Sequence, residues 1–134
     1  MKTVIVGGGP SGMSAAIAAA GSGAETVLIE KNEKLGRKLY ITGKGRCNLT
    51  NNCDTSVLLN NVVRNPRFLY SAFNAFTPAD AMDLIEKNGT PLKTERGGRV
   101  FPASDKSSDV IKAFKKALDT AGVEILTGST LKNI

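Results

Sequence analysis

The residues best suited to chemistry form a glycine-rich segment near the start of the chain. The run Val-Gly-Gly-Gly-Pro-Ser-Gly, which ends at Gly12, matches the pattern G-x-G-x-x-G. In this pattern Gly7 permits a tight turn, Gly9 lets a pyrophosphate approach the backbone, and Gly12 lets a helix pack closely on a sheet. The N–H groups at the helix start then hold the phosphates. The segment therefore predicts a dinucleotide site that includes Gly7, Gly9, Pro10, Ser11 and Gly12.

A carboxylate follows this segment at the spacing that the same motif requires. Glu30 ends an apolar run and lies about 20 residues beyond the glycines, where a carboxylate can accept hydrogen bonds from both hydroxyls of an adenosine ribose. It would repel a ribose 2'-phosphate. Glu30 therefore favours FAD or NAD over NADP as the ligand of this first site.

Three consecutive elements are needed to position these residues. Apolar residues 4–6 predict a buried strand, the small residues of 10–20 predict a helix with proline in its first turn, and residues 26–29 predict a second buried strand. Together they make a βαβ unit. We therefore expect an α/β fold, a Rossmann-like FAD/NAD(P)-binding domain with a parallel sheet, and we place the alternative of a glycine turn without a ligand second.

Further elements follow the same kind of pattern. We expect helices over 67–76, 78–88 and 108–121, a hairpin of 92–95 with 99–101 around Gly97-Gly98, and a strand over 123–126. Ser107 or Ser108 is expected to cap the last helix, and the stripe Phe68, Phe73 and Phe76 is expected to be helical core. Residues 67–107 are a candidate for a small helical and hairpin insertion.

Periodicity fades between residues 31 and 65, a length of irregular chain that compact domains usually keep for function. Its first half, residues 36–51, combines glycines and cations with amide and hydroxyl side chains, which suits a polar, anionic ligand lying against the backbone. The glycine fingerprint does not separate FAD from NAD, because both present an adenosine and a pyrophosphate to the same turn. Both cofactors remain open on these residues alone.

Residues 36–51 read Gly-Arg-Lys-Leu-Tyr-Ile-Thr-Gly-Lys-Gly-Arg-Cys-Asn-Leu-Thr-Asn. They resemble the signature G-R-K-L-x-x-[ST]-G-x-G-R-C-N-x-[ST]-N of the flavoprotein family that includes aminoacetone oxidase and the BaiN/YhiN-like proteins. Residues 98–104 look like a later segment of that family, and the resemblance covers essentially the whole chain. Lys44 departs from the glycine that relatives often have at its position.

The resemblance implies an FAD-dependent oxidoreductase, with NAD(P)H as a candidate electron donor and a small molecule as substrate. It implies that the signature lies along the pyrophosphate and the isoalloxazine. The residues that it assigns to the cofactor are Arg37, Lys38, Thr42, Gly43, Gly45, Arg46, Cys47 and Asn48. Family members are longer, with a middle substrate domain and a C-terminal segment that closes the flavin site. We therefore expect residues 1–134 to be the N-terminal part of such a domain.

Two of these residues also have plainer interpretations. No histidine or nearby second cysteine is available to activate Cys47, so we expect it to contribute backbone rather than a nucleophile. Arg46 is as well explained by a structural ion pair as by a cofactor contact. No residue stands out as a general base, and the catalytic residues stay unassigned.

Composition narrows the remaining possibilities. With 18 Lys plus Arg against 12 Asp plus Glu the formal net charge is +6, and the basic stretch that begins at Lys31 places positive charge beside the predicted site, with Lys31 itself a candidate ligand of the cofactor. The two cysteines lack metal spacing and the chain has no histidine, so no metal site is expected. Without a leader or an apolar run of about 20 residues, a cytoplasmic protein away from membranes is expected.

Two other classes of function remain as alternatives. An NAD-dependent dehydrogenase domain would share the glycine turn and Glu30. A non-enzymatic module that binds anions or nucleic acid is favoured only by the net charge, and it lacks the aromatic platforms that single strands prefer. We therefore expect no nucleic-acid partner, and the oligomeric state stays open.

Overall fold

The computed structural model describes residues 1–133 and contains two sheets. The first is parallel, with the order β1-β2-β6, so that the strand from the end of the chain lies beside the second strand and not beside the first. Its strands are β1 (Lys2–Val6), β2 (Glu25–Ile29) and β6 (Glu124–Leu126). The predicted parallel sheet and α/β fold class are confirmed, but the expectation that residues 4–6 are buried is wrong: Val4 is 51% and Val6 57% exposed, because no described element covers their face of the sheet.

Two helices lie in this part of the molecule, the first packed on β1 and β2 and the second packed on the first. They are α1 (Pro10–Gly21) and α6 (Ser107–Thr120). Small residues let α1 pack closely, and its buried positions are Met13 and Ala16. The apolar positions of α6 recur at the helical period and are buried, with Gly122 just beyond the helix end in the left-handed region, as predicted. The expected serine cap is wrong, because Lys106 is the N-cap and makes no side-chain capping bond.

The second sheet is antiparallel, in the order β3-β5-β4. Its elements are β3 (Thr50–Asn51), β4 (Leu92–Glu95) and β5 (Arg99–Pro102), with the turn η3 (Arg96–Gly98). The predicted hairpin is confirmed, and Gly97 and Gly98 both have positive φ. Helix α5 (Pro78–Lys87) begins at the residue that the sequence predicts, and the structure shows a capping box formed by Thr77 and Asp80 at its start. Strand β3, from the signature segment, also belongs to this sheet and pairs with β5.

The segment expected to be irregular contains short helices. They are α2 (Arg37–Ile41), η1 (Thr42–Gly45) and α3 (Thr55–Asn60). The helix predicted over 67–76 is divided into η2 (Pro66–Leu69) and α4 (Tyr70–Ala75). Each of these pieces is at most six residues long, which is too short for a strong periodic signal in the sequence.

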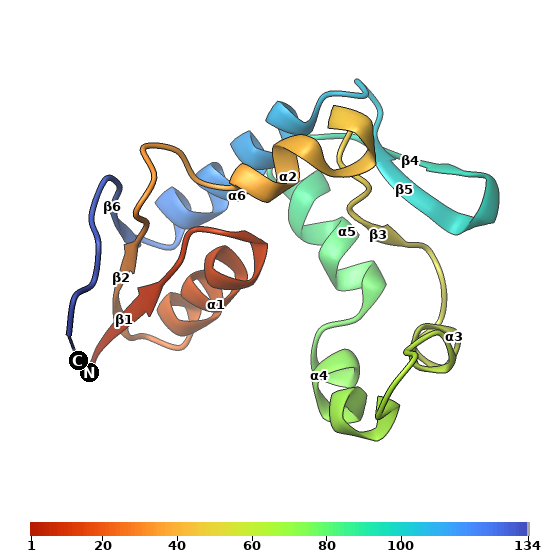
Figure 1. Cartoon of the computed structure of the whole chain (residues 1–134), viewed down its shortest axis with the longest axis horizontal. Helices are drawn as coiled ribbons and strands as arrows, with labels where there is room; N and C mark the ends of the chain where they lie inside the picture. The colour runs from red at the N-terminus through yellow and green to blue at the C-terminus, as the bar shows by residue number, and fades with distance from the viewer. Residues whose placement is uncertain (134) are drawn as a thin grey trace.

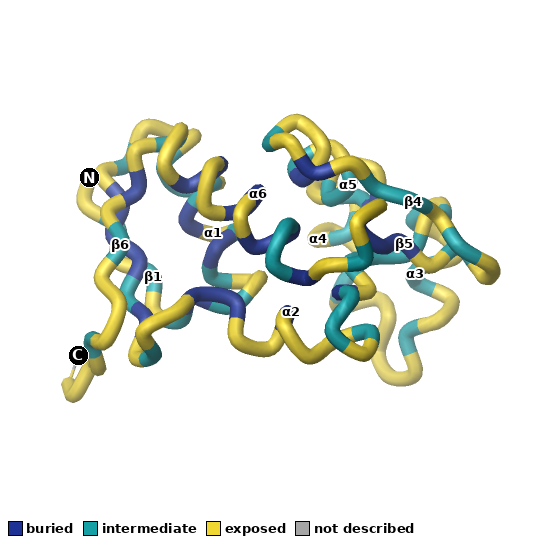
Figure 2. The backbone as a smooth tube through the Cα atoms, turned by 90° about the horizontal axis from the view of Figure 1, so that it is seen from above, coloured by how far each residue is buried: buried dark blue, intermediate teal, exposed yellow. Residues whose placement is uncertain are grey.

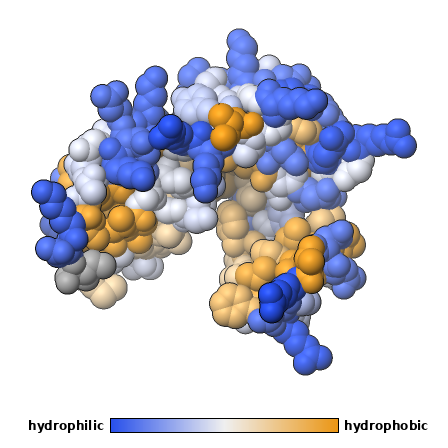
Figure 3. Space-filling model, viewed as in Figure 1, coloured by the Kyte–Doolittle hydropathy of each residue, from blue (hydrophilic) through white to orange (hydrophobic). Residues whose placement is uncertain are grey.

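The aromatic stripe of the divided helix is not core. Phe68 is 80% exposed and Phe76 46% exposed, and α3, η2 and α4 contain no buried residue. Figure 3 shows apolar surface at the end of the molecule formed by α3 and α4. The spacing of the stripe is helical, but no neighbouring element of the described chain covers it.

The two sheets are joined by helices that run between them. Figure 1 shows α6 passing from the second sheet back to the first, with α2 beside it. One core cluster therefore spans both parts, and it includes Met13, Leu28, Ile85, Val110 and Leu118. The buried stretches in Figure 2 follow β2, α1, α6 and β5. Within residues 1–133 no helix has the length and apolar character that a membrane span requires.

Candidate nucleotide-binding cleft

The glycine turn between β1 and α1 has the geometry that the sequence predicts. Gly7 has φ 105° and donates its N–H to the carbonyl of Ile29 at 2.7 Å, so the turn is held against the neighbouring strand. A Cβ added to Gly12 would collide with the carbonyl oxygen of Gly7, whereas one added to Gly9 would have no heavy atom within 4 Å. Gly12 therefore serves helix packing, and Gly9 leaves open space above the backbone.

Gly8 has a role that the motif pattern does not assign. Its N–H donates to Oε2 of Glu30 at 2.6 Å, and its carbonyl accepts the N–H of Gly36 at 2.8 Å. A Cβ at Gly8 would also collide with the side chain of Leu35. Gly8 is thus the point at which the turn, the strand-end acid and the signature segment meet. Only the folded structure reveals this role, because all three partners lie 22 or more residues away in sequence.

Glu30 is directed at this turn. Its side chain is only 8% exposed, and Oε1 accepts the backbone N–H of Asn32 at 2.8 Å and the side-chain amide of Asn32 at 2.5 Å. The hydrogen bond from the backbone of Asn32 is the main cause that lowers the pKa of Glu30. With Oε2 already bonded to Gly8, three of about four acceptor positions on the carboxylate are used. One position is left for a ligand hydroxyl, where the sequence predicts two.

The first turn of α1 presents N–H groups toward the same space. Gly9 is the N-cap, and Met13 is the first residue whose N–H bonds back to the carbonyl of Gly9, at 2.9 Å. Pro10 has no N–H, and by helix geometry the N–H groups of Ser11 and Gly12 have no intrahelical partner. With the positive end of the helix dipole, these groups form an environment suited to an anion.

The start of α2 supplies positive charge. Gly36 is bonded to Gly8 and has φ 70°, which turns the chain so that α2 begins at Arg37. Arg37 and Lys38 are exposed and line the cleft, and Nη1 of Arg37 donates to Oδ1 of Asn32 at 3.2 Å. Ile41 extends the lining and is 75% exposed. The signature segment thus reaches the glycine turn through its first six residues.

A cleft of about 980 Å³ is bounded by these elements. The residues that the sequence predicts for the cofactor and that line it are Gly7, Gly9, Pro10, Ser11, Gly12, Glu30, Lys31, Arg37 and Lys38. Ser129, Thr130 and Leu131 line it as well, and sequence reasoning missed them. They are placed there by backbone bonds, since Ser129 donates to the carbonyl of Glu30 at 3.0 Å. Their only sequence signal is their position just after a strand of the parallel sheet.

The rest of the signature does not line the cleft. The residues concerned are Thr42, Gly43, Gly45, Arg46, Cys47 and Asn48. Gly43, Lys44, Gly45 and Cys47 all have positive φ, so the segment folds tightly on itself. A Cβ at Gly43 would lie 2.8 Å from the backbone nitrogen of Asn48 and 3.0 Å from the ring of Phe101. This loop is packed against the second sheet, and a cofactor role for its residues stays a prediction.

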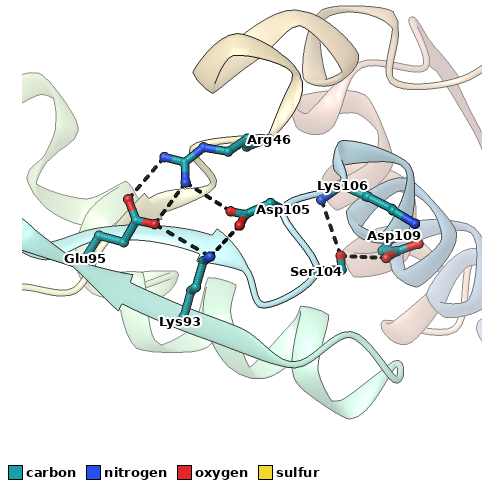
Figure 4. A network of polar contacts seen from close by, with 7 residues as sticks. All are labelled: Arg46, Lys93, Glu95, Ser104, Asp105, Lys106 and Asp109. Carbon is teal, nitrogen blue, oxygen red and sulfur yellow. Dashed lines mark hydrogen bonds and ion pairs between the residues drawn. The ribbon is translucent and has the colours of Figure 1, made fainter.

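The side chain of Arg46 is engaged in an ion-pair network (Figure 4). Nη1 donates to Glu95 at 2.9 Å and to Asp105 at 3.0 Å, while Lys93 contacts both acids at 3.6 and 2.6 Å. The guanidinium also lies 4.0 Å from the centroid of the Phe101 ring. A hydrogen bond from Arg46 lowers the pKa of Glu95, and one from Lys93 lowers that of Asp105. Of the two interpretations of Arg46, the structure shows the ion pair.

Cys47 is buried, and burial raises the pKa of its thiol, so that it stays protonated at neutral pH. This agrees with the expectation that it contributes backbone to the loop. Cys53 is also a free thiol. The described residues contain no group of three or more side chains suited to a metal ion.

Comparison with known proteins supports this description of the fold. The chain is 35% identical over 126 residues to a 3-dehydro-bile acid delta(4,6)-reductase of Clostridium scindens, covering 92% of this chain and 30% of that protein. It is 35% identical over 99 residues to a ribosomal RNA dihydrouridine synthase of Escherichia coli, covering 73% and 24%. The chain thus spans about a third or less of the length of these relatives.

A solved structure shows the same fold at low sequence identity. Thermovibrio ammonificans THI4 superposes with a TM-score of 0.60 and 14% identity, covering 94% of this chain and 38% of that one. A family model described as the HI0933-like protein Rossmann domain matches residues 1–134. The family resemblance carried by the glycine turn and the signature is therefore confirmed, and the chain belongs to the family of HI0933-like protein Rossmann domains.

Proposed function

We propose that this chain is the FAD-binding part of an FAD-dependent oxidoreductase. One observation carries the proposal, namely that the same cleft contains two features. Its backbone leaves open space above Gly9, and the carboxylate of Glu30 is bonded to the same glycine turn through the N–H of Gly8. A phosphate-binding backbone and a ribose-binding acid are the two recognition elements of an adenine dinucleotide. A glycine turn without a ligand has no need of either the open space or the acid.

The residues of the cleft fit such a ligand chemically. The free N–H groups at the start of α1 and the side chains of Arg37 and Lys38 are donors and cations for a pyrophosphate. Glu30, with its lowered pKa, is a carboxylate at neutral pH and accepts a hydroxyl but repels a 2'-phosphate. We therefore infer an adenosine with a free ribose at this site, as in FAD and NAD.

The signature segment favours the flavin. Residues 36–41 continue the cleft from the glycine turn, and the loop 42–48 follows directly at its edge. We propose that this loop lies along the isoalloxazine in the loaded, full-length protein, as the family resemblance implies. Membership of the HI0933-like family and relatives named as a reductase and a synthase support this assignment.

Bound flavin would supply hydride transfer between NAD(P)H or a small organic substrate and an acceptor. The chain's own residues would bind and orient it. The backbone amides and the cations of α2 hold negative charge at the phosphates, and cations near the ring stabilise added negative charge. A relative named as an NADH oxidase of Thermoanaerobacter brockii, 55% identical over 40 residues, supports a nicotinamide donor; the match covers 30% of this chain and 6% of that protein. No described residue is assigned a catalytic role.

A nicotinamide-dependent dehydrogenase domain is the second candidate. It is favoured by the finding that residues 42–48 do not line the cleft, so that the lining itself contains no part specific to flavin. The two candidates share the adenosine and pyrophosphate contacts and differ in what lies at the far end of the ligand.

The absorbance spectrum of the full-length protein separates these candidates. We expect a yellow protein that releases FAD on denaturation, identified by chromatography. A colourless protein that binds NAD would overturn the flavin assignment, and salt-sensitive binding of oligonucleotides without either cofactor would favour the anion-binding module. We expect residues 1–134 alone to bind FAD weakly, because the segments that complete the site in longer relatives lie outside them.

A further inference from the structure

We propose that Asn32 is the positioning residue of the cleft and that it holds Glu30 and Arg37 in their binding orientation. The inference rests on the proposed function in one respect, namely that the cleft binds an adenosine with a pyrophosphate. No motif in the sequence points to Asn32, which lies two residues beyond the expected acid.

The amide of Asn32 bridges two charged groups of opposite sign. Its Nδ2 donates to Oε1 of Glu30 at 2.5 Å, and its Oδ1 accepts from Nη1 of Arg37 at 3.2 Å. These partners also fix the orientation of the amide, since a carboxylate needs a donor and a guanidinium needs an acceptor. An amide serves both needs at once, and a deprotonated carboxylate at this position would serve only the guanidinium.

Asn32 is itself held in place through its own two backbone groups. Its N–H donates to Oε1 of Glu30 at 2.8 Å, and its carbonyl accepts the N–H of Gly128 at 3.0 Å. Asn32 therefore ties β2 to the segment that follows β6, and that segment lines the cleft. A side chain anchored at both backbone groups can hold its neighbours without reorganising when a ligand enters.

The contacts of Asn32 determine which oxygen of Glu30 is free to bind a ligand. Asn32 occupies both acceptor positions of Oε1 with its two donors, and this leaves the free position on Oε2, beside the N–H of Gly8. The other titratable side chains that line the cleft are Lys31, Arg37 and Lys38, and all three are cations. Among the described residues Glu30 is thus the one acid of the lining, and Asn32 sets which of its oxygens a ribose can use.

The substitution Asn32→Asp tests this role with almost no change in shape. At about pH 8 it places a second carboxylate against Glu30, and we expect the affinity for ADP to fall about tenfold. As the pH is lowered toward about 5, one of the two carboxyl groups takes up a proton and can donate again, so the affinity should return to within about threefold of wild type. Wild type should show only the change that protonation of the terminal phosphate of ADP causes over this range, so the ratio of variant to wild-type affinity is compared at each pH. Titration calorimetry at several pH values measures both curves.

Asn74→Asp is the matched control. Asn74 lies on α4, is exposed, and donates its side-chain amide to the carbonyl of Tyr70 at 2.8 Å, so the change removes the same kind of hydrogen bond away from the cleft. We expect an ADP affinity and a pH profile equal to those of wild type. Circular dichroism of both variants verifies the fold.

A ligand-free measurement separates this inference from the proposed function. Carbon-13 NMR of the Glu30 carboxyl should show a pKa below its ordinary value in wild type. In Asn32→Ala the backbone hydrogen bond, which is the main cause of this lowering, remains, but the side-chain hydrogen bond is lost, so the pKa should be higher than in wild type. If that shift is seen but neither ADP nor FAD binds, positioning stands and the proposed function fails. If ADP binds but Asn32→Ala leaves the Glu30 pKa unchanged and Asn32→Asp binds as wild type at every pH, the role of Asn32 is overturned.

Discussion

Two clusters of charged side chains lie in this molecule, and they differ in how completely their members satisfy one another. In the candidate cleft, Glu30 is bonded to Gly8 and Asn32 but keeps a free acceptor position, and Lys31 and Lys38 lie exposed nearby. In the second cluster, two cations and two acids pair among themselves. That second cluster consists of Arg46, Lys93, Glu95 and Asp105.

The difference distinguishes the proposed binding site from a structural ion-pair cluster. The cleft has an excess of positive charge and unused N–H groups, so that an anion with hydroxyls can complete it. The Arg46 cluster is neutral and connects three stretches of chain, the signature loop, the hairpin and the β5–α6 connection, and it needs no further partner. Charged residues in a signature can therefore belong to either class, and the partners of each side chain decide which.

The largest expected effect is a difference in stability between alanine substitutions at two glycines of the same turn. Gly12→Ala puts a methyl group against the carbonyl of Gly7, and we expect a loss of about 3 kcal/mol or more in the free energy of unfolding. Gly9→Ala adds the same methyl group to open space, with a stability cost below about 1 kcal/mol. It should nevertheless weaken FAD binding at least about tenfold, because it blocks the approach of the pyrophosphate. Urea unfolding and FAD titration measure the two effects, and equal stability losses would contradict the assignment.

The second largest effect is expected when the carboxylate of Glu30 is removed from the cleft. Glu30→Ala leaves the N–H of Gly8 and the donors of Asn32 without an acceptor, and we expect a cost of about 1–3 kcal/mol in stability together with loss of detectable FAD binding. Glu25→Ala is the control, since Glu25 pairs with Lys2 on the surface and should change neither property measurably. Retained FAD affinity in Glu30→Ala would place the ribose elsewhere.

Arg46→Ala tests whether the second cluster is only structural. We expect a lower melting temperature, with a smaller fall than for Gly12→Ala, because the bonds to Glu95 and Asp105 and the stacking on Phe101 are lost. The dissociation constant for FAD should stay at the wild-type value, because the guanidinium is already engaged by the two acids. If it rises as much as in Glu30→Ala, Arg46 acts at the cofactor, as the family resemblance implies.

The smallest expected effect is a loss of stability at low pH. Glu95 and Asp105 have lowered pKa values, so the stability that they contribute is present above their ordinary pKa and is lost as the pH falls through the lowered values. We expect wild type to lose stability below about pH 4, and Arg46→Met to lose less over the same range. Urea midpoints between neutral pH and about pH 3 measure the two slopes, and parallel slopes would show that the cluster contributes nothing to folding.

The sequence by itself determined the βαβ unit and the core of the candidate site. The glycine turn, its following helix and Glu30 could be predicted because their spacing reflects local geometry: a turn needs positive φ at Gly7, a close helix needs no Cβ at Gly12, and the acid ends the adjacent strand. The hairpin around Gly97 and the start of the helix at residue 78 are local in the same sense and were also predicted correctly.

Tertiary structure alone decided the remaining features, because their partners lie far apart in the chain. Gly8 meets Glu30 and Gly36, Asn32 meets Gly128, and residues 129–131 reach the cleft only through backbone bonds to the end of β2. The period of Phe68 and Phe76 shows which side of a helix they share, but whether another element covers that side is a property of the whole fold. For the same reason, the charge of Arg46 is visible in the sequence and its pairing with Glu95 and Asp105 is not.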